Sequence, residues 1–186
     1  MERRILLGWL GLLATGARAQ DPLWPLLAAG GHVVMLRHAL TDPGVGDPAG
    51  FKLGDCGTQR NLSEEGRREA RRLAEALRSR RVPVAAVLSS PWCRCLETAR
   101  IVFDRPVEVQ PALGNLFDRS RDEAAPQLAE LRKLVARPPA GGNVFMVTHG
   151  STVNALAGVS PATAEMVLLA PQPGGDFRVA GRLSAR

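Results

Sequence analysis

The stretch Val33-Val34-Met35-Leu36-Arg37-His38 decides the fold, because four apolar residues in a row stop at an arginine and a histidine. A short, continuous apolar run is typical of a strand that is covered on both faces in a parallel sheet. The carboxyl ends of such strands are where α/β sheets place their ligand sites. The sequence therefore predicts that Arg37 and His38 emerge at the ligand-binding edge of a sheet.

Two further segments repeat this design. The apolar run 144–147 leads into Thr148-His149-Gly150, and the run 84–88 leads into Ser89-Ser90-Pro91, with Arg94 three residues later. Parallel strands would bring these ends to the same edge of one sheet. Two imidazoles and two guanidiniums could then converge on one small anion.

The three motifs, in this order, resemble those of the histidine phosphatase superfamily. They are strand-Arg37-His38, the Ser-Ser-Pro-x-x-Arg segment that ends at Arg94, and strand-Thr-His-Gly around His149, and the similarity extends from residue 32 to residue 157. The branch of phosphoglycerate-mutase-like enzymes and small phosphatases is the more similar one. The family usually has glycine after the first histidine, whereas this chain has Ala39. We expect a slight change of turn there rather than loss of the site.

The resemblance implies a catalytic role for each residue of the cluster. A neutral nitrogen of His38 would attack phosphorus and form a phosphohistidine, while its other nitrogen bonds an acceptor such as a backbone carbonyl. Arg37 and Arg94 would bind the phosphate oxygens in place of a metal. His149 would hydrogen-bond the phosphoryl group and stabilise the transition state. The expected reaction therefore needs no metal and no cofactor.

The long loop 39–61 would form part of the substrate pocket in the resembled family. Thr41 corresponds to a hydroxyl residue that often touches phosphate there, and an ordinary loop residue is the alternative interpretation. Arg60 could line the pocket or could equally be a surface charge. The sequence alone leaves both assignments open.

The general acid is the least determined part of the site. Many family members use a carboxylate that follows the middle helix, but residues 111–116 contain no glutamate or aspartate. Asp118 is the preferred candidate, with Glu108, Asp122 and Glu165 as alternatives. A site without a strong acid would favour substrates with good leaving groups, such as phosphohistidine or phosphoanhydrides.

The pattern of the whole chain predicts one α/β domain. Ser63 is a good helix N-cap, and apolar residues from Ala70 to Leu77 follow the spacing of one buried helix face. Helix-like and strand-like segments alternate, which predicts a three-layer α/β/α sandwich with a mostly parallel central sheet. The resemblance makes this fold phosphoglycerate mutase-like. Residues 167–169 and 177–179 are expected to be antiparallel edge strands.

Residues 1–19 have the features of a secretory signal peptide. Two arginines precede an apolar stretch from Ile5 to Ala14, and Ala17-Arg18-Ala19 matches a cleavage site. A membrane anchor is the alternative, but an anchor needs about 20 apolar residues. We therefore expect residues 20–186 to form an exported domain, periplasmic or secreted, without stable membrane insertion after cleavage.

Export changes the interpretation of the three cysteines, because an oxidising compartment permits disulfides. Cys56 lies in the long loop, while Cys93 and Cys95 flank Arg94. If both segments wall one pocket, Cys56 could bond either of the other two. We favour Cys93, which leaves one thiol over. A zinc site is the alternative, but no paired ligand spacing supports it.

The net charge of +6 could indicate a nucleic-acid partner. However, the basic residues concentrate in helix-like stretches such as 67–72, and only 4% of residues are aromatic, so stacking platforms for bases are scarce. A basic surface also suits small phosphorylated substrates or inorganic phosphate. We therefore expect no nucleic-acid partner, and the sequence does not indicate an oligomeric state.

These features together predict an exported, metal-independent phosphatase of the histidine acid phosphatase type. It would hydrolyse phosphomonoesters, including phosphosugars of the cell envelope, through a phosphohistidine at His38. The alternative is a non-catalytic protein of the same fold that binds phosphate or phosphosugars and turns nothing over.

Overall fold

The computed structural model describes residues 22–185, and the predicted signal peptide, residues 1–19, lies outside the described residues. In chain order the elements are α1 (Leu23–Ala29), β1 (Val33–Arg37), η1 (Cys56–Thr58), α2 (Glu64–Ser79), β2 (Val84–Ser89), α3 (Cys93–Val102), β3 (Glu108–Val109), η2 (Pro111–Leu113), α4 (Arg121–Val135), β4 (Asn143–Thr148), α5 (Gly150–Ala157), β5 (Met166–Gln172) and β6 (Asp176–Leu183). None of the helices within residues 22–185 has both the length and the apolar content needed to cross a bilayer.

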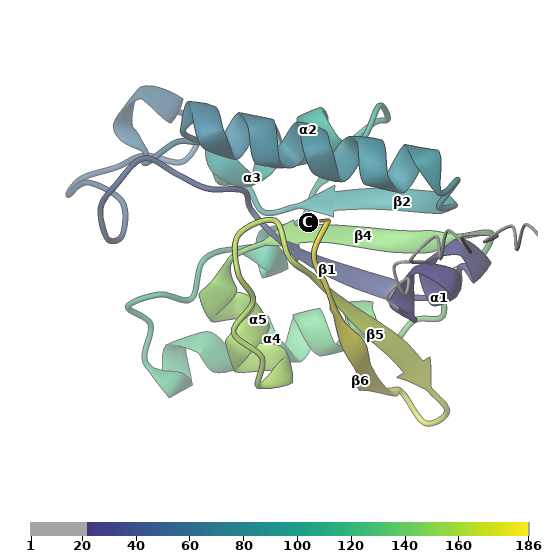
Figure 1. Cartoon of the computed structure of the whole chain (residues 1–186). Coiled ribbons are helices and arrows are strands. Elements are labelled where there is room, and N and C mark those ends of the chain that lie inside the picture. The colour runs from purple at the N-terminus through teal and green to yellow at the C-terminus, as the bar shows by residue number, and fades with distance from the viewer. Residues whose placement is uncertain (1–21, 186) are drawn as a thin grey trace, which may run out of the picture.

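A six-stranded sheet in the order β3-β2-β4-β1-β5-β6 forms the centre of the molecule. Strands β1 to β4 pair in parallel, while β5 and β6 pair antiparallel. Helices α2 and α3 cover one face of the sheet, and α4 and α5 cover the other (Figure 1). The predicted three-layer sandwich with a mostly parallel sheet is confirmed.

The two late strands are antiparallel, as expected, but only β6 is an edge strand. β5 pairs with β1 on one side and with β6 on the other, so the prediction of an edge position for residues 167–169 was wrong. The physical reason is visible in the burial of residues 166–169, which are all covered. Four buried apolar residues in a row indicate a strand that is covered on both faces, as the interior strands of this layered sheet are, whereas the edge strand β6 is largely exposed.

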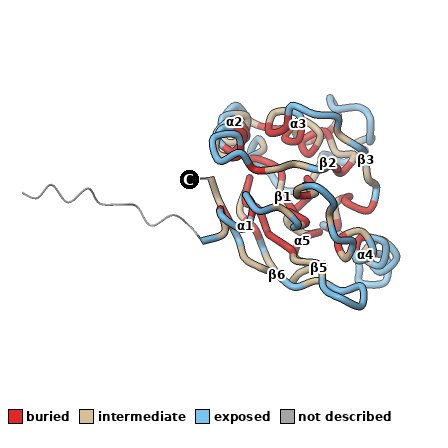
Figure 2. The backbone as a smooth tube through the Cα atoms, turned by 90° about the vertical axis from the view of Figure 1, so that its right-hand side faces the viewer, coloured by how far each residue is buried: buried red, intermediate tan, exposed pale blue. Residues whose placement is uncertain are grey.

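The core consists of two apolar clusters, one on each face of the sheet. In β1, Val34 and Leu36 belong to the cluster under α2 and α3, while Val33 and Met35 belong to the cluster under α4 and α5. Burying each such side chain contributes about 1.5–3 kcal/mol. The inner strands β1, β4 and β5 are accordingly buried over most of their length, and the red tube at the centre of the molecule follows them (Figure 2). They hold the residues at their ends in fixed positions.

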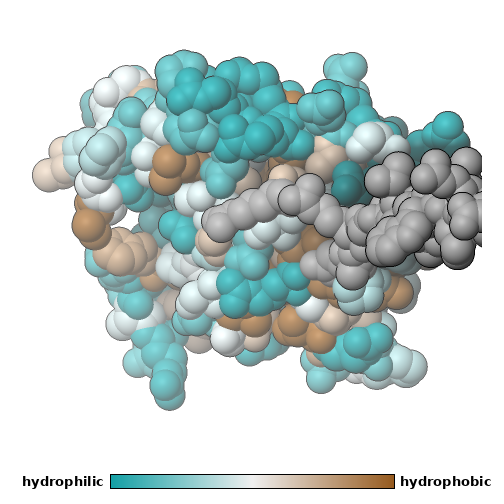
Figure 3. All heavy atoms as spheres, in the orientation of Figure 1, coloured by the Kyte–Doolittle hydropathy of each residue, from teal (hydrophilic) through white to brown (hydrophobic). Residues whose placement is uncertain are grey.

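Helix α2 begins where the sequence predicts and carries much of the surface charge. The Ser63 side chain accepts a hydrogen bond from the Gly66 amide at 3.1 Å, which caps the first turn. Arg68 and Arg72 pair with Glu65 on the exposed side of the helix. Hydrophilic side chains accordingly gather over α2 (Figure 3). The basic stretch is thus a solvated helix face, as the sequence indicates.

Gly66 in the first turn of α2 packs directly against the backbone that follows His38. A Cβ atom at this position would lie 1.9 Å from the carbonyl oxygen of Leu40. The contact is between the backbone of Gly66 and the backbone of Leu40, so no flexible side chain could move aside to relieve it. The contact therefore sets the distance between α2 and the loop after β1.

We expect Gly66→Ala to destabilise the protein by about 2 kcal/mol, within the usual range for overpacking a close contact. This result would oppose helix propensity, which favours alanine over glycine by about 1 kcal/mol. Urea unfolding measures the difference. Gly57→Ala is the matched control, since its Cβ would meet the nearest atom at an ordinary 3.4 Å. A Gly66→Ala protein as stable as the wild type would contradict the close packing.

Candidate active site

The ends of three parallel strands meet at one edge of the sheet. Arg37 at the end of β1 lies opposite Thr148 of β4, and Ser89 at the end of β2 lies opposite Val147. A pocket of about 470 Å³ opens at this edge. Its lining includes two histidines, three arginines and a set of uncharged residues, namely Arg37, His38, Arg60, Arg94, His149, Asn115, Phe117, Ser151, Asn154 and Ser160. The structure thus brings Arg37, His38, Arg94 and His149 together.

The environment of His38 fixes both its tautomer and its charge. Its Nδ1 lies 2.8 Å from the carbonyl oxygen of Ala39, and a carbonyl can only accept, so Nδ1 carries the hydrogen. Nε2 keeps its lone pair and bonds no described residue. Burial lowers the pKa of His38 to about 3, and the charges of Arg94 and Arg37 act in the same direction, against a raising effect of the Ala39 bond. His38 is therefore a neutral imidazole at pH 7.

Ala39, which stands where the resembled family usually has glycine, fits this turn without distortion. Its methyl group is buried in the core cluster under α2 and α3. Its amide donates to Oγ1 of Thr98 at 3.1 Å, and its carbonyl orients His38. The residue does not adopt a positive φ. The expectation that alanine leaves the site intact agrees with this geometry.

His149 is the N-cap of α5, and its ring lies 5.5 Å from that of His38 between centroids. Its Nδ1 is 3.4 Å from Nη2 of Arg94, and its Nε2 is 2.8 Å from Oγ of Ser90. Because arginine only donates, Nδ1 accepts and Nε2 carries the hydrogen. Burial, together with His38 and Arg94, holds the pKa of His149 well below its ordinary value.

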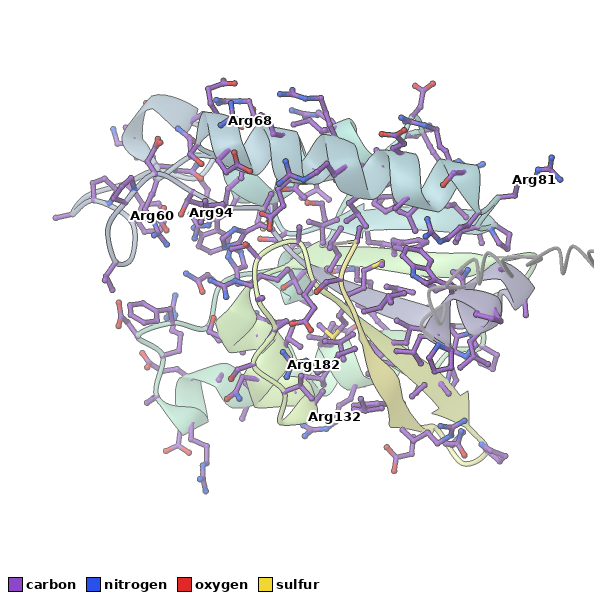
Figure 4. The ribbon with its side chains drawn as sticks, in the orientation of Figure 1. Arg60, Arg68, Arg81, Arg94, Arg132 and Arg182 are labelled. Carbon is purple, nitrogen blue, oxygen red and sulfur yellow. A yellow bond between two sulfur atoms is a disulfide. The ribbon has the colours of Figure 1, made fainter. Side chains whose placement is uncertain are left out.

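Three guanidiniums surround the histidines, each bonded to the protein through its terminal nitrogens. Arg37 donates to the carbonyl of Pro161, Arg60 to the carbonyl of Gly44, and Arg94 to Asp47. Arg60 and Arg94 lie at the same end of the molecule (Figure 4). The buried Nε–H of each of the three arginines has no acceptor among the described residues.

An unpaired buried donor costs about 1–3 kcal/mol, so three of them at one pocket need an explanation. An oxyanion supplies several acceptor oxygens and also compensates the positive charge. The pocket is therefore arranged to bind a small anion such as phosphate.

Comparison with known proteins agrees with this geometry. Residues 33–117 match the sequence model of the histidine phosphatase superfamily (branch 1). Over this stretch the chain is similar in sequence to the histidine phosphatase superfamily. No curated protein sequence matches the chain.

Solved structures show that the histidine phosphatase fold extends over most of the chain. The protein histidine phosphatase SixA bound to tungstate is 21% identical, with 83% of this chain and 97% of that chain covered and a TM-score of 0.59. A mycobacterial glucosyl-3-phosphoglycerate phosphatase in complex with VO3 is 20% identical, with 82% and 98% covered and a TM-score of 0.62. A phosphoserine phosphatase from Entamoeba histolytica is 13% identical, with 83% and 98% covered and a TM-score of 0.57.

Two residues that the sequence assigned to the site do not line the pocket. Thr41 forms an isolated antiparallel bridge with Leu62 and is not one of the residues that line the pocket. Asp118 is exposed and has a left-handed backbone conformation, with φ of 63°. Its neighbour Phe117 takes the position at the pocket instead. The turn at Asp118 therefore points the aromatic ring inward and leaves the carboxylate in solvent.

The alternative candidates for the general acid are also placed elsewhere. Glu165 accepts from the amide of Ala162 at 2.6 Å and pairs with Arg182 at 2.7 Å. Glu108 and Asp122 are exposed on β3 and α4. Within residues 22–185 no aspartate or glutamate lines the pocket, and no three histidine, cysteine or acidic side chains gather closely enough to hold a metal ion.

The loop 39–61 is fastened to the start of α3, where Arg94 lies. Cys56 and Cys93 form a disulfide, which is the pairing favoured from the sequence. Oε1 of Gln59 also accepts from the amide of Cys93 at 3.0 Å. Cys95 remains a buried thiol, and burial raises its pKa to about 12. A disulfide that closes a loop of this length contributes about 3–4 kcal/mol by chain entropy.

The structure adds residues that the sequence analysis missed or left open. Arg60 lines the pocket, which resolves its ambiguous assignment. Ser90 bonds His149, and Asp47 binds Arg94. Asp47 follows Gly-Val-Gly in a loop rich in turn residues, so only its acidic charge near the motif could have drawn attention to it.

We expect the protein to lose stability as the pH falls from about 6.5 toward 3. Unfolded histidine titrates near 6.5, whereas the pKa of folded His38 is about 3, so the unfolded state binds more protons in this window. Urea unfolding at pH 7.5 and pH 5, in phosphate-free buffer, measures the loss. His38→Gln should show a smaller loss between these pH values, while His32→Gln, outside the pocket, should keep the wild-type loss. An unchanged loss in His38→Gln would contradict the neutral, buried state of this ring.

Proposed function

We propose that this protein is a metal-independent phosphatase of the histidine phosphatase superfamily that hydrolyses phosphomonoesters through a phosphohistidine at His38. The observation that carries the proposal is the tautomer of this ring. Because Nδ1 is bonded to the Ala39 carbonyl, the lone pair of Nε2 is available inside a pocket lined by three arginines. A neutral imidazole with an unbonded lone pair is the form required for attack on phosphorus.

The reaction then proceeds in two steps. Nε2 of His38 attacks phosphorus, a P–N bond forms, and the P–O bond to the leaving group breaks. Water subsequently attacks the phosphohistidine, which releases phosphate and restores the ring. The guanidiniums of Arg37 and Arg94 neutralise charge on the non-bridging oxygens throughout. A phosphoryl dianion beside His149 favours a proton on its Nδ1, which then donates to a phosphoryl oxygen instead of accepting from Arg94.

The uncharged half of the pocket supports a sugar as the leaving group. Asn115 accepts from Ser151 at 2.7 Å, and Asn154 donates to Ser160 at 3.1 Å, so amides and hydroxyls are fixed along this wall. Phe117 remains 45% exposed beside them. Such a wall can hydrogen-bond sugar hydroxyls and pack against the apolar face of a sugar ring. This composition favours the phosphosugar substrates that the sequence analysis named.

An exported location completes the proposal. Its support is the signal-like sequence of residues 1–19 and the Cys56–Cys93 disulfide, since disulfides persist mainly in oxidising compartments. The periplasm or the cell exterior meets this condition. Phosphorylated sugars of the envelope would be accessible there.

A second candidate is a non-catalytic phosphate- or phosphosugar-binding protein. The specific observation in its favour is the pocket lining, which contains no aspartate or glutamate within residues 22–185. Such a protein would bind phosphate or vanadate and hydrolyse nothing. The two experiments below separate it from the phosphatase.

Brief reaction with p-nitrophenyl phosphate should label His38 with phosphate that is labile in acid and stable in base. Mass spectrometry of the quenched protein locates the label. His38→Ala should lose both the label and turnover, His32→Ala should keep both, and a chelator should change neither. Full activity in His38→Ala would exclude this mechanism, and absence of turnover with retained vanadate binding would favour the binding protein.

Turnover should depend steeply on the leaving group, because no carboxylate within residues 22–185 lines the pocket to protonate it. General acid catalysis typically contributes about 10²–10⁴-fold, so we expect kcat/KM for p-nitrophenyl phosphate to exceed that for glycerol phosphate by about 10²-fold or more. A sugar phosphorylated at its more acidic anomeric hydroxyl should fall between them. Steady-state kinetics on the three esters checks this order. Equal rates would show that a proton donor acts in the pocket.

A further inference from the structure

Among residues 22–185, Asp47 is the one carboxylate that forms a salt bridge with an arginine of the pocket. Its Oδ1 accepts from Nη1 of Arg94 at 2.7 Å and from the Arg60 amide at 3.1 Å. Its Oδ2 accepts from Nη2 of Arg94 at 3.1 Å and from Nε1 of Trp92 at 3.0 Å. The two side chains of the ion pair are 3% and 1% exposed. Asp47 is therefore a fully bonded, buried carboxylate behind Arg94.

This arrangement excludes Asp47 as the proton donor of the reaction. Each oxygen already accepts two hydrogen bonds, so a proton on either one would displace a donor. Burial by itself would raise the pKa of Asp47, but the hydrogen bonds and charge of Arg94, aided by the Arg60 amide and Trp92, hold that pKa below its ordinary value. Asp47 does not line the pocket. Its effect on substrate must pass through Arg94.

Asp47 determines which edge of Arg94 faces the pocket. A guanidinium has an end formed by its two terminal nitrogens and a side edge formed by Nε and Nη2. Asp47 occupies the end, since it binds both Nη1 and Nη2. Along the side edge, Nη2 lies 3.4 Å from Nδ1 of His149, and Nε has no acceptor among the described residues. The side edge thus lies beside His149 and is the edge of Arg94 that Asp47 leaves unpaired.

Asp47 also sets the charge of the pocket. Arg37, Arg60 and Arg94 carry three positive charges, and Asp47 removes one, which leaves two. A phosphomonoester carries about −1.5 to −2 charges at pH 7. The remaining charge of the pocket therefore matches the dianion.

We propose that Asp47 is a positioning residue for phosphoryl transfer, which holds the side edge of Arg94 toward the phosphoryl group and adjusts the pocket charge to a phosphomonoester dianion. This role rests on the proposed phosphatase function. The Cys56–Cys93 disulfide and the Gln59 bond to the Cys93 amide hold the loop that supplies Asp47 against α3. The loop 39–61 then influences phosphoryl transfer through the Asp47–Arg94 ion pair.

Kinetics of Asp47→Asn and Asp47→Glu test the role. We expect Asp47→Asn to lower kcat for p-nitrophenyl phosphate by about 10- to 100-fold, because a slight misplacement of a positioning contact costs up to about 10²-fold. KM should change by less than about threefold, since the lost negative charge offsets the lost alignment in the ground state. Asp47→Glu restores the charge on a longer arm and should recover part of kcat. Asp42→Asn, an exposed carboxylate on the same loop, is the matched control.

A readout that does not require turnover is the Nε–H signal of Arg94 in ¹⁵N NMR, assigned by its loss in Arg94→Gln. In the wild type, addition of vanadate should give one sharp, shifted signal. In Asp47→Asn the signal should broaden or disappear under the same conditions. If Asp47→Asn does not fold, Asp47→Glu carries both measurements.

The outcomes separate this proposal from the phosphatase proposal. A wild-type kcat together with an unchanged Arg94 signal in Asp47→Asn would overturn the positioning role and leave the phosphatase intact. A wild-type protein that turns over no ester would instead remove the phosphatase. In that case the Arg94 signal still decides whether Asp47 orients the guanidinium.

Discussion

The parallel pairing of β1 with β4 and of β4 with β2 is the constraint on which the site depends. It places Arg37 opposite Thr148 and Ser89 opposite Val147, so that the residues following each strand meet at one edge. A shift of one residue would turn every buried side chain of a strand to the other face. Apolar clusters cover both faces of the sheet, so core packing fixes the strand register. The register in turn fixes the distance between His38 and His149.

The sequence reveals those parts of the molecule that obey local rules. The strands are identified by apolar runs that end in Arg37-His38, Ser89-Ser90-Pro91 and Thr148-His149. A strand covered on both faces shows a continuous apolar run instead of an alternation of apolar and polar residues. The serine cap at residue 63 and the apolar spacing behind it identify α2. From these elements the parallel sheet, the three layers and the meeting of Arg37, His38, Arg94 and His149 follow as one consequence. The favoured cysteine pairing rests on the same reasoning, since both partners stand beside the pocket.

The parts that the sequence did not reveal depend on how long loops fold back. Asp47 reaches Arg94 only through the path of the loop 39–61, which no local propensity defines. A backbone bridge to Leu62 fixes the position of Thr41. A left-handed turn at Asp118 places Phe117, rather than Asp118, at the pocket. In both cases the backbone conformation, and not the chemistry of the side chain, determines the position. The position of β5 inside the sheet could have been predicted from its four consecutive apolar residues, a pattern that β1 also has.

The Cys56–Cys93 disulfide makes the structure of the loop beside Arg94 depend on when the bond forms. Such a bond forms only where thiols are oxidised, so an exported chain would acquire it late, after leaving the reducing cytosol. Until then the loop that carries Asp47 would lack its covalent anchor to α3. In the reduced chain only noncovalent contacts, such as the hydrogen bond between Gln59 and the Cys93 amide, would hold this loop and its Asp47 against Arg94.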